Sequence, residues 1–113
     1  MRGFFWEWDQ WNHQWLPVHY QVAEDYYSNI DRLDIMDAAA KSSVPLLVVH
    51  ARDDATVPAS MALALTKIHP NTESVLLESG DHLLGMSHPF QEKALPRVLE
   101  RVVQRTLSFL KRQ

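Results

Sequence analysis

Two short segments in the second half of this sequence carry residue types that could move a proton. HARDDATVP, at positions 50–58, follows an apolar run and contains Asp53 and Asp54, and SGDHLLG, at 79–85, follows another and contains His82. A carboxylate that orients an imidazole, with an imidazole that accepts and returns a proton, makes two of the three groups of a nucleophilic triad. The two segments therefore predict an acid–histidine pair, with either aspartate as the acid.

The elements around these segments must bring them together. The apolar run at 44–49 is typical of a strand buried on both faces, and 74–78 is expected to form a second strand. A helix is expected from Pro58, and a long amphipathic stripe predicts a last helix over about 91–111. Strand, helix, strand, helix is a βαβα unit, whose crossover makes the two strands parallel. Since the carboxyl ends of parallel strands meet at one edge of a sheet, we expect both segments to lie side by side there.

The same tracts resemble the α/β-hydrolase family. VPLLVVHARDDATVP (44–58) is similar to that family's strand and acid turn, and ESGDHLLG (78–85) is similar to its histidine loop. EDYY (24–27) resembles a segment of a carboxylesterase and lipase subfamily that includes a plant embryogenesis-associated protein. The acid precedes the histidine, as in the family's order of Ser, Asp and His. The resemblance implies an α/β fold in which this chain forms the C-terminal βαβα portion of a hydrolase sheet.

The resemblance also assigns roles to individual residues. In the family the acid turn reads small residue, two further residues, then Asp, so Ala51 makes Asp54 the triad acid. Asp53 is the second choice, and its simplest alternative is an exposed turn aspartate. His82 matches the general base, against the alternative of an ordinary surface-loop histidine. Asp54 and His82 should then lie near each other in space, although 28 positions separate them. His50, at the end of the first strand, is expected to be a partly buried, hydrogen-bonded histidine.

The third group of a triad is missing from the sequence. The family's nucleophile lies in G-x-S-x-G, but the three glycines here are Gly3, Gly80 and Gly85, no two of them four apart. We therefore expect the C-terminal part of a serine-type hydrolase of carboxylic esters or lipids, inactive alone because it lacks the nucleophile. One alternative is a non-catalytic interaction module derived from the fold. Another is a relative of the hydrolases with an Asp nucleophile, such as dehalogenases and epoxide hydrolases.

The first 43 residues differ in character from the α/β part expected over 44–113. All four tryptophans lie here, and a helix face is suggested by the spacing of Phe4, Trp8, Trp11 and Trp15. Pro17 ends that helix. Two further helical pieces are expected over 20–41, the second capped by Asp31. The whole segment is thus predicted to be a helical, aromatic-rich lead.

Composition excludes several classes of function. The sequence has 113 residues, 11 Lys and Arg against 14 Asp and Glu, and no cysteine. The mild net charge of −3 argues against a nucleic-acid surface, and the lack of cysteine removes disulfides and thiolate sites. No histidine spacing fits a metal template, so no metal or cofactor is predicted. No apolar run approaches the ~20 residues of a membrane span. We expect a soluble, cytoplasmic chain that binds an ester or lipid once completed by the missing half, and that can self-associate.

Overall fold

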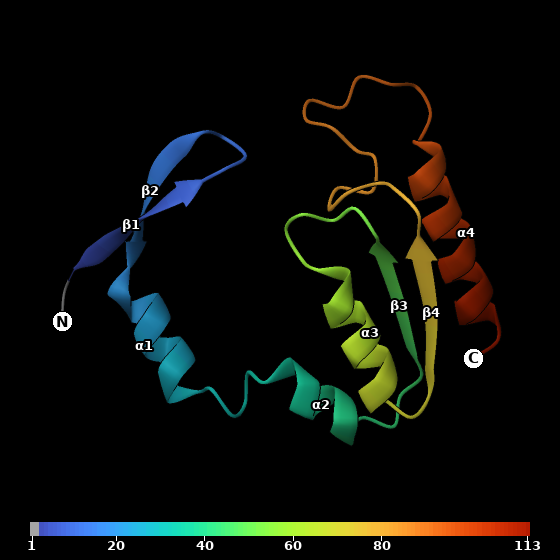
Figure 1. Ribbon diagram of the computed structural model, residues 1–113, viewed down its shortest axis with the longest axis horizontal. Coiled ribbons are helices and arrows are strands. Elements are labelled where there is room, and N and C mark those ends of the chain that lie inside the picture. The colour runs from blue at the N-terminus through green and yellow to red at the C-terminus, as the bar shows by residue number, and fades with distance from the viewer. Residues whose placement is uncertain (1–2) are drawn as a thin grey trace. The chain divides into compact units, whose positions relative to one another are not determined.

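The computed structural model describes residues 3–113 and contains both helices and strands, in keeping with the general α/β class (Figure 1). Contacts between residues divide the chain into two units, one ending at Ala38 and the other running from Ala39 to Gln113. No helix within residues 3–113 combines the length and the apolar character needed to span a membrane.

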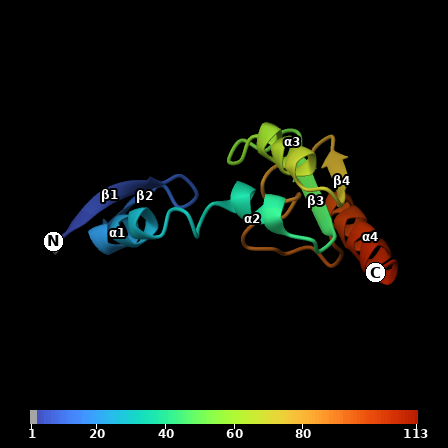
Figure 2. The same cartoon turned by 90° about the horizontal axis from the view of Figure 1, so that it is seen from below.

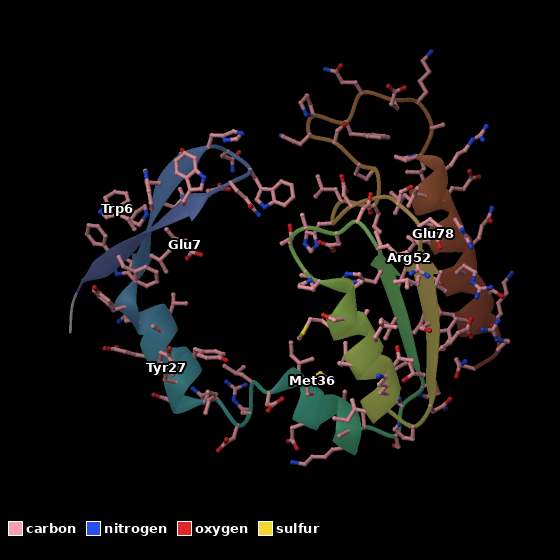
Figure 3. All side chains as sticks on the ribbon, viewed as in Figure 1. Trp6, Glu7, Tyr27, Met36, Arg52 and Glu78 are labelled. Carbon is pink, nitrogen blue, oxygen red and sulfur yellow. The ribbon has the colours of Figure 1, made fainter. Side chains whose placement is uncertain are left out.

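The first unit begins with a β-hairpin, so the helix predicted over the tryptophan-rich segment is wrong. β1 (Phe4–Asp9) and β2 (Gln14–His19) pair antiparallel, with Phe4 opposite His19 and Asp9 opposite Gln14. Aromatic residues favour strands, and this stretch alternates with a period of two as well as repeating with a helical period. Figure 3 shows the result at Trp6 and Glu7, which point to opposite sides of β1.

The turn of the hairpin explains why the strand pattern prevails. Asp9 Oδ1 accepts hydrogen bonds from the backbone N–H groups of Trp11 (2.9 Å) and Asn12 (3.3 Å), and Asp9 Oδ2 accepts one from the Asn12 side chain (2.6 Å). His13 has a φ of 51°, a left-handed conformation that a tight turn needs. These polar side chains therefore form the turn instead of the outer face of a helix.

Two short helices follow, as expected from the sequence. α1 (Tyr20–Ser28) and α2 (Ile35–Lys41) contain no buried residue. The capping residue of α2 differs from the predicted Asp31: Asp34 Oδ1 accepts hydrogen bonds from the N–H groups of Met36 (2.9 Å) and Asp37 (3.0 Å). Asp34 fits because an N-cap side chain must reach N–H groups two and three residues ahead. The first 43 residues are therefore a hairpin and two helices, and the structure divides the chain inside α2 instead of after residue 43.

The second unit has the predicted order of strand, helix, strand, helix. Its elements are β3 (Leu46–Ala51), α3 (Ala59–Ile68), β4 (Thr72–Leu77) and α4 (Arg97–Lys111). β3 and β4 are parallel, from Leu46 opposite Thr72 to Ala51 opposite Leu77. Figures 1 and 2 show α3 and α4 on opposite faces of this two-stranded sheet. The last helix begins at Arg97 instead of near residue 91, because Pro96 disfavours helical backbone in the residue before it.

The core of the second unit is small. Ala51, Val75 and Leu77 are buried together, and β3, α4 and the loop after β4 pack against them with half-buried side chains: Leu47, Val49, Leu84, Val98 and Val102. No large side chain within residues 3–113 is fully buried. A sheet of two strands also leaves one edge of each strand unpaired within the described chain. The site at the carboxyl ends of β3 and β4 is therefore supported by a sheet of only two strands within the described residues and by a small core.

Candidate functional site

The acid turn begins where β3 ends. Asp54 N–H donates to the carbonyl of Ala51 (3.3 Å), and Asp54 Oδ1 accepts hydrogen bonds from the N–H groups of Thr56 and Val57, both at 2.8 Å. An aspartate that binds backbone N–H groups two and three residues ahead forms a compact turn. Only 5% of the Asp54 side chain is exposed. The turn therefore holds a carboxylate against the end of the sheet with one oxygen, Oδ2, directed to another partner.

That partner is His82, from the loop after β4. Asp54 Oδ2 lies 2.9 Å from His82 Nδ1. The predicted proximity of these residues is thus confirmed, across 28 positions of sequence. An ionised carboxylate only accepts hydrogen bonds, so Nδ1 donates, and Nε2 is then the basic nitrogen of the neutral ring. The His82 side chain is 42% exposed, so the imidazole is accessible at the protein surface.

The environment of Asp54 keeps it ionised. Burial raises the pKa of this carboxyl, but hydrogen bonds from the Val57 backbone, the His82 ring and the Thr56 backbone lower it, as does the charge of His82. The lowering contacts prevail and bring the pKa of Asp54 to about 2, against an ordinary 3.8. At neutral pH the site therefore contains a carboxylate anion hydrogen-bonded to an imidazole.

The histidine loop depends on unusual backbone conformations. Gly80 has a φ of 138° and Gly85 a φ of 80°, and Asp81 and Leu84 have positive values of 53° and 55°. A Cβ atom at Gly80 would lie 2.6 Å from Val98 Cγ1 of α4, so glycine is needed there for space as well as conformation. The N–H of Gly85 donates to the carbonyl of Gly80 (2.7 Å), closing the loop around His82.

Asp53, the second choice for the acid, has different partners. Its Oδ1 accepts a hydrogen bond from the N–H of Asp81 (2.9 Å), and its Oδ2 accepts one from the N–H of Gly80 (3.3 Å). Asp53 is exposed, as the simpler interpretation of the sequence had it, but it contacts the histidine loop. Sequence reasoning missed this contact because a carboxylate that binds backbone leaves no pattern in the residues it binds.

His50 fulfils the expectation of a partly buried, hydrogen-bonded histidine. Its side chain is 12% exposed, and Nε2 donates to the carbonyl of Val57 at 2.8 Å. The same nitrogen lies 3.6 Å from Asp54 Oδ2. His50 therefore joins the end of β3 to the far side of the acid turn and adds a second imidazole beside the carboxylate.

An exposed ion pair joins the same two strand ends. Arg52 Nε lies 3.2 Å from Glu78 Oε1, and Figure 3 shows both residues at the carboxyl ends of β3 and β4. The Glu78 side chain is 82% exposed, so the pair contributes little to stability.

A shallow cavity lies beside the histidine loop. Its volume is about 200 Å³, and it is lined by the end of β4, the start of the loop that follows and the first turns of α4: Leu77, Glu78, Ser79, Arg97, Val98 and Arg101. In the part of the chain from residue 3 onward, no group of three or more histidine or acidic side chains could hold a metal ion. The hydrogen-bonded pair of Asp54 and His82 therefore has a small depression next to it.

Comparison of the chain with models of known protein families finds no match, and comparison with curated proteins finds none.

Proposed function

We propose that this chain provides the acid and the base of a serine-type α/β-hydrolase that cleaves carboxylic esters or lipids. The proposal depends on one observation above the others, the 2.9 Å contact between Asp54 Oδ2 and His82 Nδ1. Further support comes from the low exposure of Asp54, its depressed pKa and the position of both residues at the carboxyl ends of parallel strands. Open α/β sheets bind ligands at that edge.

In the proposed reaction His82 acts through Nε2. It takes the proton of a serine hydroxyl as that oxygen attacks the ester carbonyl, and it then gives the proton to the departing alkoxide. Water repeats the sequence on the acyl-serine, which releases the acid and restores the hydroxyl. Asp54 keeps Nδ1 as the donor nitrogen and stabilises the imidazolium formed in each half of the reaction.

The nucleophile and the oxyanion hole would come from residues outside these 113. No G-x-S-x-G occurs in the sequence. Ser79 and Ser87 belong to the histidine's own loop, and Ser60 is the second residue of α3. None of these serines follows a strand directly into a helix, the turn that exposes the nucleophile in this chemistry. The chain alone is therefore inactive as a triad hydrolase.

The test begins with the coding region. We expect the reading frame to continue upstream of Met1 and to encode G-x-S-x-G. The longer product should hydrolyse a p-nitrophenyl ester, and His82→Ala should lower kcat by at least about 10³-fold, since removing a triad member costs roughly that much or more. His88→Ala is the matched control, because His88 belongs to the same loop and should leave kcat unchanged.

A frame that contains no such serine, or a longer product equally active with His82→Ala, would contradict the proposal.

The second candidate function is a non-catalytic interaction module. It is favoured by one face of the hairpin, where Trp6 and Trp15 are 57% and 60% exposed and line an apolar depression of about 410 Å³. An exposed apolar surface of this kind is typical of a binding face. If the coding region contains no G-x-S-x-G, this second function replaces the first.

A further inference from the structure

We infer that Asp53 is a positioning residue whose carboxylate holds the histidine loop in the place where His82 meets Asp54. This inference rests on the proposed function, because the position of His82 matters for a reaction only if His82 moves a proton. It extends that function by assigning Asp53, the other aspartate of the acid turn, a separate role in the placement of the histidine.

The hydrogen bonds of Asp53 connect the residue next to Asp54 with the two residues next to His82. Asp53 immediately precedes Asp54, and its oxygens bind the N–H groups of Gly80 (3.3 Å) and Asp81 (2.9 Å), the two residues before His82. Both carboxylate oxygens are used, one for each of two successive N–H groups. Hydrogen bonds to an ionised acceptor are stronger than neutral ones. Asp53 thereby holds the backbone of the histidine loop at a fixed distance from the acid turn.

The loop needs such a contact because its own backbone is unfavourable. Gly80 and Asp81 both have positive φ angles, and for a residue with a side chain, such as Asp81, that conformation persists only when surrounding contacts enforce it. Burial does not enforce it, because Asp81 and His82 are both exposed. The N–H that Asp53 binds most closely, at 2.9 Å, is that of Asp81.

The two aspartates therefore divide the work of the turn. Asp54 binds the imidazole and the backbone of its own turn, whereas Asp53 binds the backbone of the opposite loop. Neither can replace the other, because each carboxylate already binds its own set of donors. Asp53 does not touch the reacting ring in these contacts, so its effect on proton transfer acts through His82.

The experiment is NMR on the full 113-residue chain, uniformly labelled with ¹⁵N. In the wild type we expect a downfield proton resonance on His82 Nδ1, the signature of its hydrogen bond to Asp54, and slow exchange of the N–H protons of Gly80 and Asp81. In Asp53→Ala those two protons should exchange about tenfold faster or more, as loss of a charge-assisted hydrogen bond implies. The Nδ1 resonance should broaden or disappear.

Asp53→Asn should give an intermediate result, since its side chain retains one oxygen acceptor. Glu78→Ala is the matched control: it removes the exposed ion pair with Arg52 at the same strand ends and should leave the His82 signal unchanged. The spectrum of the core methyl groups reports whether each variant is folded. If Asp53→Ala does not fold, the His82 resonance and the N–H exchange rates of Asp53→Asn test the inference instead.

A folded Asp53→Ala with an unchanged His82 resonance would overturn the inference and leave the proposed function standing. The same holds for an Asp53→Asn spectrum identical to the wild type when Asp53→Ala is unfolded. If the wild type itself lacks the Nδ1 resonance, the acid–histidine pair does not exist in solution, and the proposed function fails together with the inference.

Discussion

At the scale of single residues, the site separates an acid that is held tightly from a base that is accessible. Asp54 is almost buried and receives hydrogen bonds from two backbone N–H groups and one imidazole. His82 is anchored through Nδ1 at a partly exposed position. A fixed carboxylate beside an accessible imidazole is what general-base chemistry requires, because the acid must not move while the base exchanges its proton.

The depressed pKa of Asp54 predicts a particular loss of stability in acid. In the folded chain the pKa is about 2, below the ordinary value of 3.8, so folding favours the ionised form. Its contribution to the free energy of unfolding is therefore complete above pH ~4 and is lost as the pH falls toward about 2. Asp54→Asn removes this contribution. The stability difference between wild type and variant should shrink over that interval in urea titrations followed by circular dichroism.

Glu78→Gln provides the control for that experiment, because its ion pair is exposed and its loss should leave the stability close to that of the wild type. A difference between wild type and Asp54→Asn that stays constant from neutral pH down to pH ~2 would contradict the account of Asp54.

At the scale of elements, the strands and their loops were the predictable part. An apolar run without polar interruption, followed by a proline and a second apolar run, fixed the order of β3, α3 and β4, and the rule for parallel strands then placed Asp54 beside His82. The hairpin was not predictable in the same way, since its aromatic residues fit two periods at once. Asp9 decides between these periods through hydrogen bonds that only the folded turn contains.

The contact between Asp53 and the histidine loop could not be predicted from the sequence, for a related reason. Asp53 and Asp54 are the same residue type at adjacent positions, and which one meets the imidazole depends on the backbone path of the turn. The conformations of Gly80 and Asp81 add a second unknown, because positive φ at Asp81 cannot be derived from residue type alone.

Gly80→Ala should destabilise the second unit. The added Cβ would lie 2.6 Å from Val98 Cγ1, and the φ of 138° is unfavourable for any residue with a side chain. Strain of this kind costs about 1–3 kcal/mol, so the variant should unfold at correspondingly lower urea concentration. Val98→Ala relieves the contact but removes a side chain packed on the core, so the double variant should lose less stability than the sum of the two single losses. Full stability of Gly80→Ala would contradict the described loop.

The hairpin predicts a spectroscopic signature. Trp8 and Trp15 lie opposite each other on β1 and β2, and their rings meet edge to face, with centroids 5.5 Å apart and an angle of 63° between their planes. Two indoles at this distance couple and produce a paired positive and negative band in circular dichroism. Trp15→Phe should abolish that couplet, whereas Trp6→Phe, which alters a ring packed on Phe4, should preserve it. A couplet insensitive to Trp15→Phe would argue against this pairing of strands.

At the scale of the whole molecule, apolar surface is the dominant feature. The buried apolar core within residues 3–113 consists of small and medium side chains, while large apolar residues are exposed on the hairpin and on α4. On α4 the exposed positions include Val103, Leu107 and Leu110, which repeat at helical spacing along one side. Chains with so little buried surface are marginally stable and tend to bury their exposed faces against other molecules.

We therefore expect the isolated chain to self-associate. Sedimentation in the analytical ultracentrifuge should show an average mass that rises with concentration, because the hairpin face around Trp6 and Trp15 can cover a second copy. Replacing both tryptophans by lysine should shift the chain toward the monomer, and replacing the exposed, uncharged Gln21 and Ser28 of helix α1 by lysine serves as a charge-matched control. A strictly monomeric wild type with a sharp cooperative melt would contradict this expectation.

The central claim is that the chain contains two groups of a triad and no nucleophile, and labelling with a fluorophosphonate probe tests it most directly. The probe reacts with a serine whose hydroxyl is activated by a neighbouring base. We expect no stoichiometric labelling of the purified 113-residue chain, and the same background with His82→Ala. Stoichiometric labelling of the wild type that disappears with His82→Ala would contradict the claim, because one of its own serines would then be a nucleophile.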